Sequence, residues 1–283
     1  MGLRIATNVT AMKGQRNLAT STDNQASSLE KLSSGQRINR AGDDAAGLAI
    51  SEKLKGSMRS INQAKRNASD GVSLIQTAEG GLNEVGNILI RLRELSVQSA
   101  SDTIGAEERQ YTNFEFQALS GEIDRIAQVT EFNGAKLLNG VGNTFDFQVG
   151  IHNNPEQDRL QYSPQATDVT VGKLGLTEAN VATKESAQMN LDRIDTAISA
   201  VNQNRAGLGA LQNRLQSTIR NLGIQNESLN EANSRIRDTD FAQESSELTK
   251  QSILNQAGTA VLSQANSVQM SALKLLYSIG LNR

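Results

Sequence analysis

The sequence predicts a mainly α-helical protein, a long antiparallel helical bundle or coiled coil with a small β-hairpin region and paired N- and C-terminal helices. Apolar residues recur every seven positions over two long stretches, one beginning at Leu54 and the other ending at Ile236. A short stretch between them alternates with period two instead. Both prolines, at 155 and 164, lie in this middle part, so neither interrupts a heptad series.

The first long helix is predicted from its heptad series. Its members are Leu54, Ile61, Ala68, Ile75, Leu82 and Leu89. Gly35 is a helix C-terminal signal for a preceding helix, and Asp43 and Asp44 stand where an N-cap and a first-turn acid are expected. Gly80 and Gly81 each weaken the helix by about 1 kcal/mol relative to Ala. The period continues through them, so we expect one unbroken helix.

The second long helix carries the stricter repeat. Its series is Ile194, Val201, Leu208, Leu215, Leu222, Leu229 and Ile236. At 1.5 Å per residue this seam runs roughly 60 Å, longer than a compact globule can bury. It therefore needs a long partner, which the first seam supplies. Thr183 is the expected N-cap, and a third, shorter helix is expected over about residues 106–129.

The middle of the chain is predicted to hold the hairpin, at about residues 141–174. Asn133-Gly134 and Asn139-Gly140 are turn signals. Residues 145–149 and 160–162 alternate apolar and polar side chains, and residues 169–171 are a third candidate strand.

The two chain ends are amphipathic but carry little charge. Residues 251–283 contain only two charged side chains, Lys274 and Arg283, and Asn and Gln make up 49 of the 283 residues. Asp240, with Gln243 three residues on, resembles a capping box for the last helix. Such helices suit a setting in which both faces touch neighbours, so we expect the ends to pack together and against other copies. The assembly residues are Ile5, Val9, Leu18, Leu29, Leu32, Leu254, Val261, Val268, Leu275 and Ile279.

Catalytic and ligand-binding patterns are missing, so we predict no enzyme activity, no cofactor and no metal site. The chain has no cysteine and one histidine, His152, which stands without a second ligand. Asp43 and Asp44 would point about 100° apart on a helix, so a cap is the better interpretation. Arg91, Arg93 and Glu94 fit a solvated helix face better than an anion site. The remaining alternatives are a filament subunit, a signalling coiled coil and an unsupported enzyme.

Nucleic acid and membranes are not expected partners. Lys and Arg total 28 against 30 Asp and Glu, and no basic patch is interleaved with aromatic residues. The longest uncharged run, residues 251–273, is too rich in Gln, Asn and Ser to insert into a membrane. Arg4, Lys13 and Arg16 interrupt any apolar stretch at the N-terminus, so no secretory signal peptide is predicted.

Four segments of the chain resemble bacterial flagellins closely and in the family's order. They are LSSGQRINRAGDDAAGLAISEKL at 32–54, IRLRELSVQSA at 90–100, EFNGAKLLNG at 131–140 and DTDFAQESSELTKQSILNQAGTAVLSQAN at 238–266. The resemblance implies a short form without variable outer domains, because only 44 residues separate Gly140 from Thr183 inclusively. A hook–filament junction protein is the nearest alternative within this resemblance.

The resemblance also implies an architecture, a location and partners. It implies a homopolymer of flagellin subunits, an extracellular bacterial flagellum filament used for swimming and exported by a type III route. Residues 1–42 and 240–283 would form the filament core, and residues 43–239 would form the long-helix domain. Further implied partners are an export chaperone and the filament cap and hook-junction proteins. The Toll-like receptor for flagellin would contact Arg91, Leu95 and Glu115, which align with the family's RELSVQ and EIDR segments.

Overall fold

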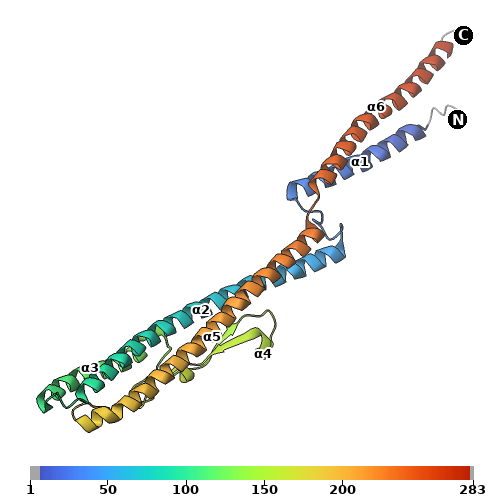
Figure 1. Ribbon diagram of the computed structural model, residues 1–283. Coiled ribbons are helices and arrows are strands. Elements are labelled where there is room, and N and C mark those ends of the chain that lie inside the picture. The colour runs from blue at the N-terminus through green and yellow to red at the C-terminus, as the bar shows by residue number, and fades with distance from the viewer. Residues whose placement is uncertain (1–6, 281–283) are drawn as a thin grey trace. The chain divides into compact units, whose positions relative to one another are not determined.

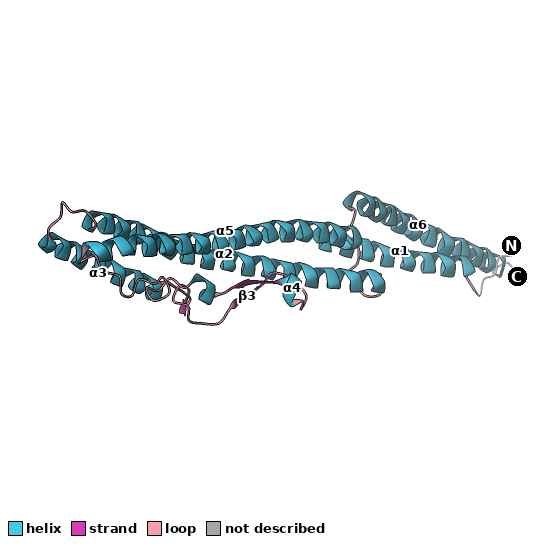
Figure 2. Ribbon diagram, turned by 60° about the horizontal axis from the view of Figure 1, so that its bottom comes forward, coloured by secondary structure: helices cyan, strands magenta, loops and turns pink. Residues whose placement is uncertain are grey.

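The computed structural model describes the backbone of residues 7–280 and the side chains of residues 7–271 and Lys274. Its longer helices are α1 (Val9–Ser34), α2 (Ala45–Ser99), α3 (Ala106–Val129), α5 (Lys184–Arg237) and α6 (Phe241–Gly280). The middle holds β1 (Glu131–Phe132), β2 (Ala135–Lys136), β3 (Phe145–Gln148), α4 (Pro155–Asp158), β4 (Arg159–Tyr162) and a 3₁₀ turn, η1 (Pro164–Thr167). The predicted mainly α fold with paired terminal helices is confirmed (Figures 1 and 2).

The chain divides into two compact units. The terminal unit comprises residues 1–56 and 229–283, and the central unit comprises residues 57–228. Helices α2 and α5 are each one continuous helix, as their heptad series predict. Each contributes residues to both units.

The central unit is organised around the antiparallel pair of α2 and α5, with α3 and the hairpin beside them (Figure 2). Its buried core includes the middle members of both heptad series. They are Ala68, Ile75, Leu82 and Leu89 from α2 and Ile194, Val201, Leu208 and Leu215 from α5. Ile61 and Leu222 are also buried, whereas Leu54, Leu229 and Ile236, in the terminal unit, are half-buried. Helix α3 adds Phe116, Ile123 and Ala127 to the core.

The helix ends follow local capping chemistry. Asp44 Oδ1 accepts the Gly47 N–H at 2.8 Å and caps α2. Asp43 lies outside the helix, where its Oδ2 accepts the N–H groups of Asn39 and Arg40 at 3.0 and 2.9 Å. The N-cap of α2 is therefore Asp44, one residue later than the sequence predicts, and Asp43 closes the preceding loop instead. Gly35 ends α1 with a positive φ of 69°, a conformation that glycine adopts without strain.

Caps on the two C-terminal helices agree with the sequence. Thr183 Oγ1 accepts the Ser186 N–H at 3.2 Å before α5. Asp240 Oδ1 accepts the N–H groups of Ala242 and Gln243 at 2.9 and 3.2 Å before α6. These contacts satisfy amides that a helix leaves without intrahelical partners.

Two antiparallel strand pairs occupy the middle segment. β1 and β2 form a tight hairpin around Asn133 and Gly134, whose φ angles of 50° and 79° explain the Asn-Gly sequence. β3 pairs with β4 in a register that places Phe145 opposite Tyr162. Residues 169–171 do not form the third strand. The Val169 N–H donates to the Leu138 carbonyl at 3.0 Å and the Val171 N–H to Asp124 Oδ1 at 2.8 Å, so loop contacts use their backbone groups instead of a ladder.

Within residues 7–280, no helix is both long enough and apolar enough to cross a membrane.

Candidate assembly surface

The terminal unit is built on an antiparallel pair formed by α1 and α6 (Figure 1). Three contacts along the pair define its direction. Lys31 Nζ lies 3.8 Å from a Glu244 carboxylate oxygen, Ser21 contacts Gln251, and the Asn8 side chain donates to the Ala265 carbonyl at 3.2 Å. The start of α1 therefore lies beside the later part of α6.

Leucines and glycines fit together across the pair. A Cβ added at Gly14 of α1 would lie 3.2 Å from Leu262 Cδ1, and a Cβ added at Gly258 of α6 would lie 3.2 Å from Leu18 Cδ1. Each helix thus presents one leucine to a glycine of the other. The missing side chains permit a close approach of the two backbones at these levels.

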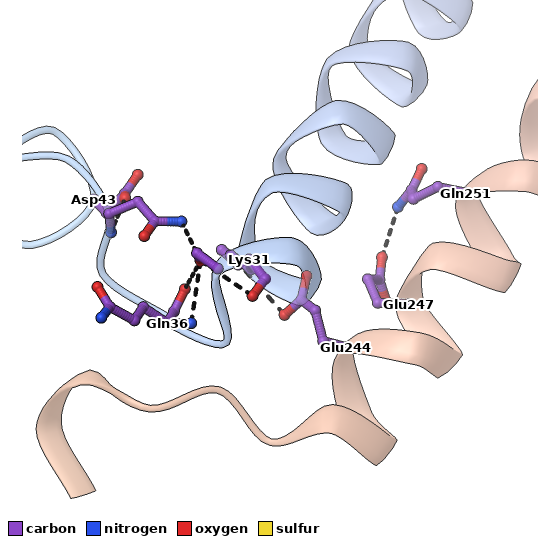
Figure 3. Close-up of polar contacts among 8 residues, drawn as sticks. Lys31, Gln36, Asp43, Glu244, Glu247 and Gln251 are labelled. Atoms are coloured by element: carbon purple, nitrogen blue, oxygen red, sulfur yellow. Dashed lines mark hydrogen bonds and ion pairs between the residues drawn. The ribbon is translucent and has the colours of Figure 1, made fainter. Parts of the chain in front are cut away.

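The buried centre of the pair is polar. Ser21 is 7% exposed and Gln251 is 6% exposed, and Ser21 Oγ donates to Gln251 Oε1 at 2.9 Å. Gln251 Nε2 in turn donates to Glu247 Oε1 at 2.6 Å, an arrangement visible in Figure 3. This bond and a second one from Lys250 lower the pKa of the Glu247 carboxyl. The network therefore satisfies its buried polar groups.

A second amide cluster lies one turn further along. Asn255 Nδ2 donates to Gln25 Oε1, and Thr22 Oγ1 donates to Asn255 Oδ1 at 3.4 Å. The sequence predicts that the amide-rich, weakly charged chain ends pack together, and in these two clusters amides and hydroxyls from both ends bond to each other. Fully buried large apolar side chains do not occur among the described residues of α1 and α6.

The apolar residues predicted to drive assembly lie mostly on the outside of this pair. Their exposed fractions are 50% for Val9, 51% for Leu29, 47% for Leu254, 57% for Val261 and 49% for Val268. We call these five residues the outer rows. Leu18 and Leu32 are half-buried. Ile5 and the side chains of Leu275 and Ile279 lie outside the described residues.

A different series on α6 faces α1, and sequence reasoning missed its role. The residues that contact α1 include Gln251, Asn255, Gly258 and Leu262, which recur at alternating steps of four and three. That spacing is the heptad signal of a helix-packing face, here carried by small and amide residues. Large apolar residues mark the outer rows, whereas the inner face carries none of the large apolar series and is not revealed by that pattern.

An elbow joins the terminal helices to the ends of the long helices within the terminal unit. The Arg37 N–H donates to the Arg237 carbonyl at 2.6 Å, and the Thr239 N–H donates to the Gly35 carbonyl at 3.0 Å. The Arg237 side chain is only 12% exposed, and its Nη1 pairs with Glu52. Backbone N–H donation from Arg40 and Asn39 holds the pKa of Asp43 below its ordinary value.

The described structure offers little for catalysis or metal binding. His152 lies in the connection between β3 and β4, on the edge of a 590 Å³ hollow that also borders Arg214 of α5. Among the described residues, no three His, Asp or Glu side chains gather as a metal ion would need. Asp43 and Asp44 make backbone hydrogen bonds, as described above. Arg93 pairs with Asp195 of α5 at 2.6 Å.

The three predicted receptor-contact residues separate into two environments. Arg91 donates to Glu115 of α3 at 2.8 Å and to Glu94 at 2.9 Å, and all three side chains are exposed. The bonds to Glu94 and Glu115 raise the pKa of the Arg91 guanidinium. Leu95 is 1% exposed and belongs to the core. The expectation that Leu95 contacts a receptor is therefore corrected, because its side chain packs inward.

Family comparison covers most of the chain. The bacterial flagellin N-terminal helical region matches residues 5–143, and the bacterial flagellin C-terminal helical region matches residues 191–276. A flagellin of Halalkalibacterium halodurans is 45% identical over 269 residues, covering 95% of this chain and 98% of the relative. A flagellar filament 30.7 kDa core protein of Treponema maltophilum is 42% identical with the same coverage of each chain. The flagellin of Bacillus subtilis is 42% identical and covers 97% of this chain and 100% of the relative.

Solved structures agree with the fold. The crystal structure of Bacillus cereus flagellin has a TM-score of 0.50 and 30% identity, covering 56% of this chain and 88% of that one. A putative flagellar hook-associated protein from Vibrio parahaemolyticus has a TM-score of 0.57 at 12% identity, covering 69% of this chain and 100% of that one. At 12% identity the second likeness shows a shared fold alone.

Proposed function

The chain belongs to the bacterial flagellin family and is a structural subunit of the flagellar filament, and from this premise we propose that the outer rows of α1 and α6 make the contacts between subunits. The observation that carries this proposal is the exposure of Leu254, Val261 and Val268 at seven-residue intervals along one helix. Exposed apolar rows of this kind mark surfaces that another protein covers.

The inner and outer faces suit different tasks. The inner face of the pair is closed by hydrogen bonds within one chain, such as that from Ser21 to Gln251. Among the described residues the outer rows find no such partner, and they stay accessible. Contacts between unlike surfaces on identical subunits need not close into a ring, and they produce an open helical polymer.

We infer a layered filament from the difference between the inner face and the outer rows of the α1–α6 pair. We place residues 1–42 and 240–283 in the filament core and residues 43–239 in the layer around it. The compact terminal unit extends to residue 56 and begins again at residue 229, so it includes the elbow as well as the terminal helices. The amide-rich inner face of α1 and α6 supports a core position, because its amides bond to each other within the chain and need no water as partners.

Other partners are proposed on the family relationship. An export chaperone would cover the apolar surface of α6 before assembly, and cap and hook-junction proteins would contact the same terminal unit at the filament ends. The location would be the extracellular filament, reached by type III export. The Toll-like receptor for flagellin would contact Arg91 and Glu115 on free subunits. The role proposed throughout is structural, with no catalytic step.

Seeded elongation tests the outer rows directly. Purified subunits are added to short filament fragments, and filament length is measured by electron microscopy. The triple variant Leu254→Ser, Val261→Ser and Val268→Ser should stay folded, because all three side chains are exposed, and should not elongate the seeds. A matched control on the same helix changes exposed polar residues through Thr249→Ser, Gln256→Ser and Gln264→Ser, and should elongate normally.

Two outcomes would contradict different parts of the proposal. Normal elongation by the apolar triple variant would place the contacts between subunits elsewhere. Failure of the unaltered protein to elongate any seed would argue against the filament function itself. Circular dichroism of each variant distinguishes loss of assembly from loss of helix.

A further inference from the structure

Two Asn-Gly pairs lie in the middle segment of the chain, at Asn133-Gly134 and Asn139-Gly140. An asparagine side chain loses its amide nitrogen most readily before glycine, because glycine has no side chain to hinder attack by its own backbone nitrogen. By sequence alone the two pairs share the same chemistry. Their surroundings in the folded central unit are different.

The first pair forms the exposed turn between β1 and β2. The Asn133 side chain makes no hydrogen bond to another described residue, and a Cβ built at Gly134 would meet nothing within 4 Å. Each flanking strand has only two residues, and a turn between such short strands opens at low cost. The turn can therefore rearrange while the core of the central unit stays packed.

The second pair is held in place by its neighbours. Asn139 and Gly140 are both half-buried, and Asn139 Oδ1 accepts the Val141 N–H at 3.0 Å. A Cβ built at Gly140 would lie 2.5 Å from Asp168 Oδ2, so the backbone is closely packed there. The preceding residue, Leu138, is buried. Rotation of this pair would break the Asn139 bond and disturb packed groups.

We propose that Asn133 is a site of spontaneous deamidation in the folded subunit and that its surroundings protect Asn139. The Gly134 backbone nitrogen, after giving its proton to hydroxide, attacks Asn133 Cγ. The new C–N bond closes a succinimide ring, and the side-chain nitrogen takes a proton from water and leaves as ammonia. Water then opens the ring. Cleavage between the ring nitrogen and Cγ gives aspartate, and cleavage between that nitrogen and the backbone carbonyl carbon gives isoaspartate.

The two products should affect the hairpin differently. Aspartate tolerates a positive φ much as asparagine does, so it keeps the turn, where φ at position 133 is 50°, and adds a negative charge. Isoaspartate runs the chain through Cβ and adds a backbone atom to a two-residue turn, which cannot then keep the strand register. β2 leads directly into Leu137 and Leu138, which are buried, and the Leu137 carbonyl accepts the Tyr162 hydroxyl at 2.6 Å. Isoaspartate should therefore loosen the central unit.

Deamidation rates at the two positions test the proposal within one molecule. The full-length subunit is incubated folded in mildly alkaline buffer and, in parallel, unfolded in urea. Peptide mass spectrometry then follows aspartate and isoaspartate at positions 133 and 139. In urea the two rates should be similar, since both asparagines precede glycine. In the folded subunit Asn133 should react at least about tenfold faster than Asn139, because local opening costs differ between an exposed turn and a packed one.

A pair of variants tests the cause of the protection. Val141→Pro removes the N–H that Asn139 accepts, at a position that is 70% exposed, and should raise the Asn139 rate toward its value in urea. Val141→Ala keeps that N–H and is the matched control, so the Asn139 rate should not change. Asn133→Asp should melt like the unaltered protein, whereas a sample enriched in isoaspartate at position 133 should melt at a lower temperature.

Two results would overturn the assignment of Asn133. One is equal rates at the two positions in the folded subunit. The other is an Asn133 that reacts in urea and stays intact in the folded subunit, because the hairpin turn would then protect it. An Asn139 rate that Val141→Pro leaves unchanged would overturn the protective role of the Asn139 bond. None of these measurements involves assembly, so a failure of seeded elongation would not affect them.

Discussion

Arg237, at the last turn of α5, donates through Nε to Gln36 Oε1 at 2.8 Å, which ties the end of a long helix to the segment that follows α1. Residue 36 also forms an isolated antiparallel bridge with Asp238. The same guanidinium contacts Ser51 Oγ at 3.3 Å and pairs with Glu52 of α2. One side chain therefore joins three segments of the terminal unit.

Removing this side chain should loosen the elbow. Arg237→Ala leaves Gln36 and Ser51 without their partner in a site where Arg237 is only 12% exposed, so we expect a loss of about 1–3 kcal/mol in unfolding free energy. Arg235→Ala is the control two residues away, because Arg235 is 77% exposed and pairs with Glu231 on its own helix. It should change stability by less than about 0.5 kcal/mol. Urea unfolding followed by circular dichroism measures both.

The terminal unit should lose stability in acid. The bond from Arg237, and a second from Lys55, hold the pKa of Glu52 below its ordinary value of 4.5. Because the folded pKa is the lower one, the stabilisation is present above pH 4.5 and is lost as the pH falls through the folded value. Asp43 adds a loss of the same sign, since its pKa is also lowered.

Glu52→Gln isolates this effect. The variant should melt at a lower temperature than the unaltered protein at pH 7, and its melting temperature should fall less between pH 5 and pH 3. Glu227→Gln, at an exposed position of α5, is the control and should keep the full pH dependence. Parallel melting curves for Glu52→Gln and the unaltered protein at every pH would show that this pair does not contribute.

Adjacent glycines in α2 should respond to alanine in opposite ways. A Cβ at Gly80 would meet nothing within 4 Å, so Gly80→Ala should stabilise the helix by about 1 kcal/mol. A Cβ at Gly81 would lie 2.7 Å from Leu138 Cδ1 and 2.8 Å from Thr130 Oγ1. Gly81→Ala should therefore destabilise the central unit by about 1–3 kcal/mol despite its better helix propensity. Equal effects of the two changes in urea unfolding would contradict this account.

The long helices and the turn at Asn133-Gly134 were predictable because their signals are local. Heptad spacing locates α2 and α5, and the Asn133-Gly134 turn matches the φ angles that the hairpin requires. Residues 169–171 failed as a strand because their partners, among them Asp124, come from distant segments that the local alternation does not reveal. The open space beside Gly80 and the close contacts at Gly81 likewise depend on where residues 130 and 138 return to α2.

For the candidate assembly surface too, the local sequence predicts part of the structure and contacts with a distant segment decide the rest. The sequence identifies which residues of α6 are apolar, but the partner of each face depends on α1. From the sequence of α6 alone, Gln251 would be expected at the surface. It is buried because α1 packs against it and places Ser21 opposite. Leu95 is the opposite case: the family resemblance implied a receptor contact, which needs an exposed side chain, whereas its side chain is 1% exposed and lies in the core.

Under the proposed receptor contact, Arg91→Ala should weaken activation of the Toll-like receptor for flagellin by free subunits by about tenfold or more, because exposed arginines are common binding hot spots. Arg91 holds Glu115 at 2.8 Å, so the two side chains present one joint surface across α2 and α3. Arg93→Ala is the matched control, since Arg93 pairs with Asp195 on α5 instead. Leu95→Ala should act through a core cavity and lower stability by about 2–5 kcal/mol. Dose–response curves in receptor-reporter cells, taken on folded monomer, measure activation, and equal potency of the Arg91→Ala and Arg93→Ala variants would remove Arg91 from the contact.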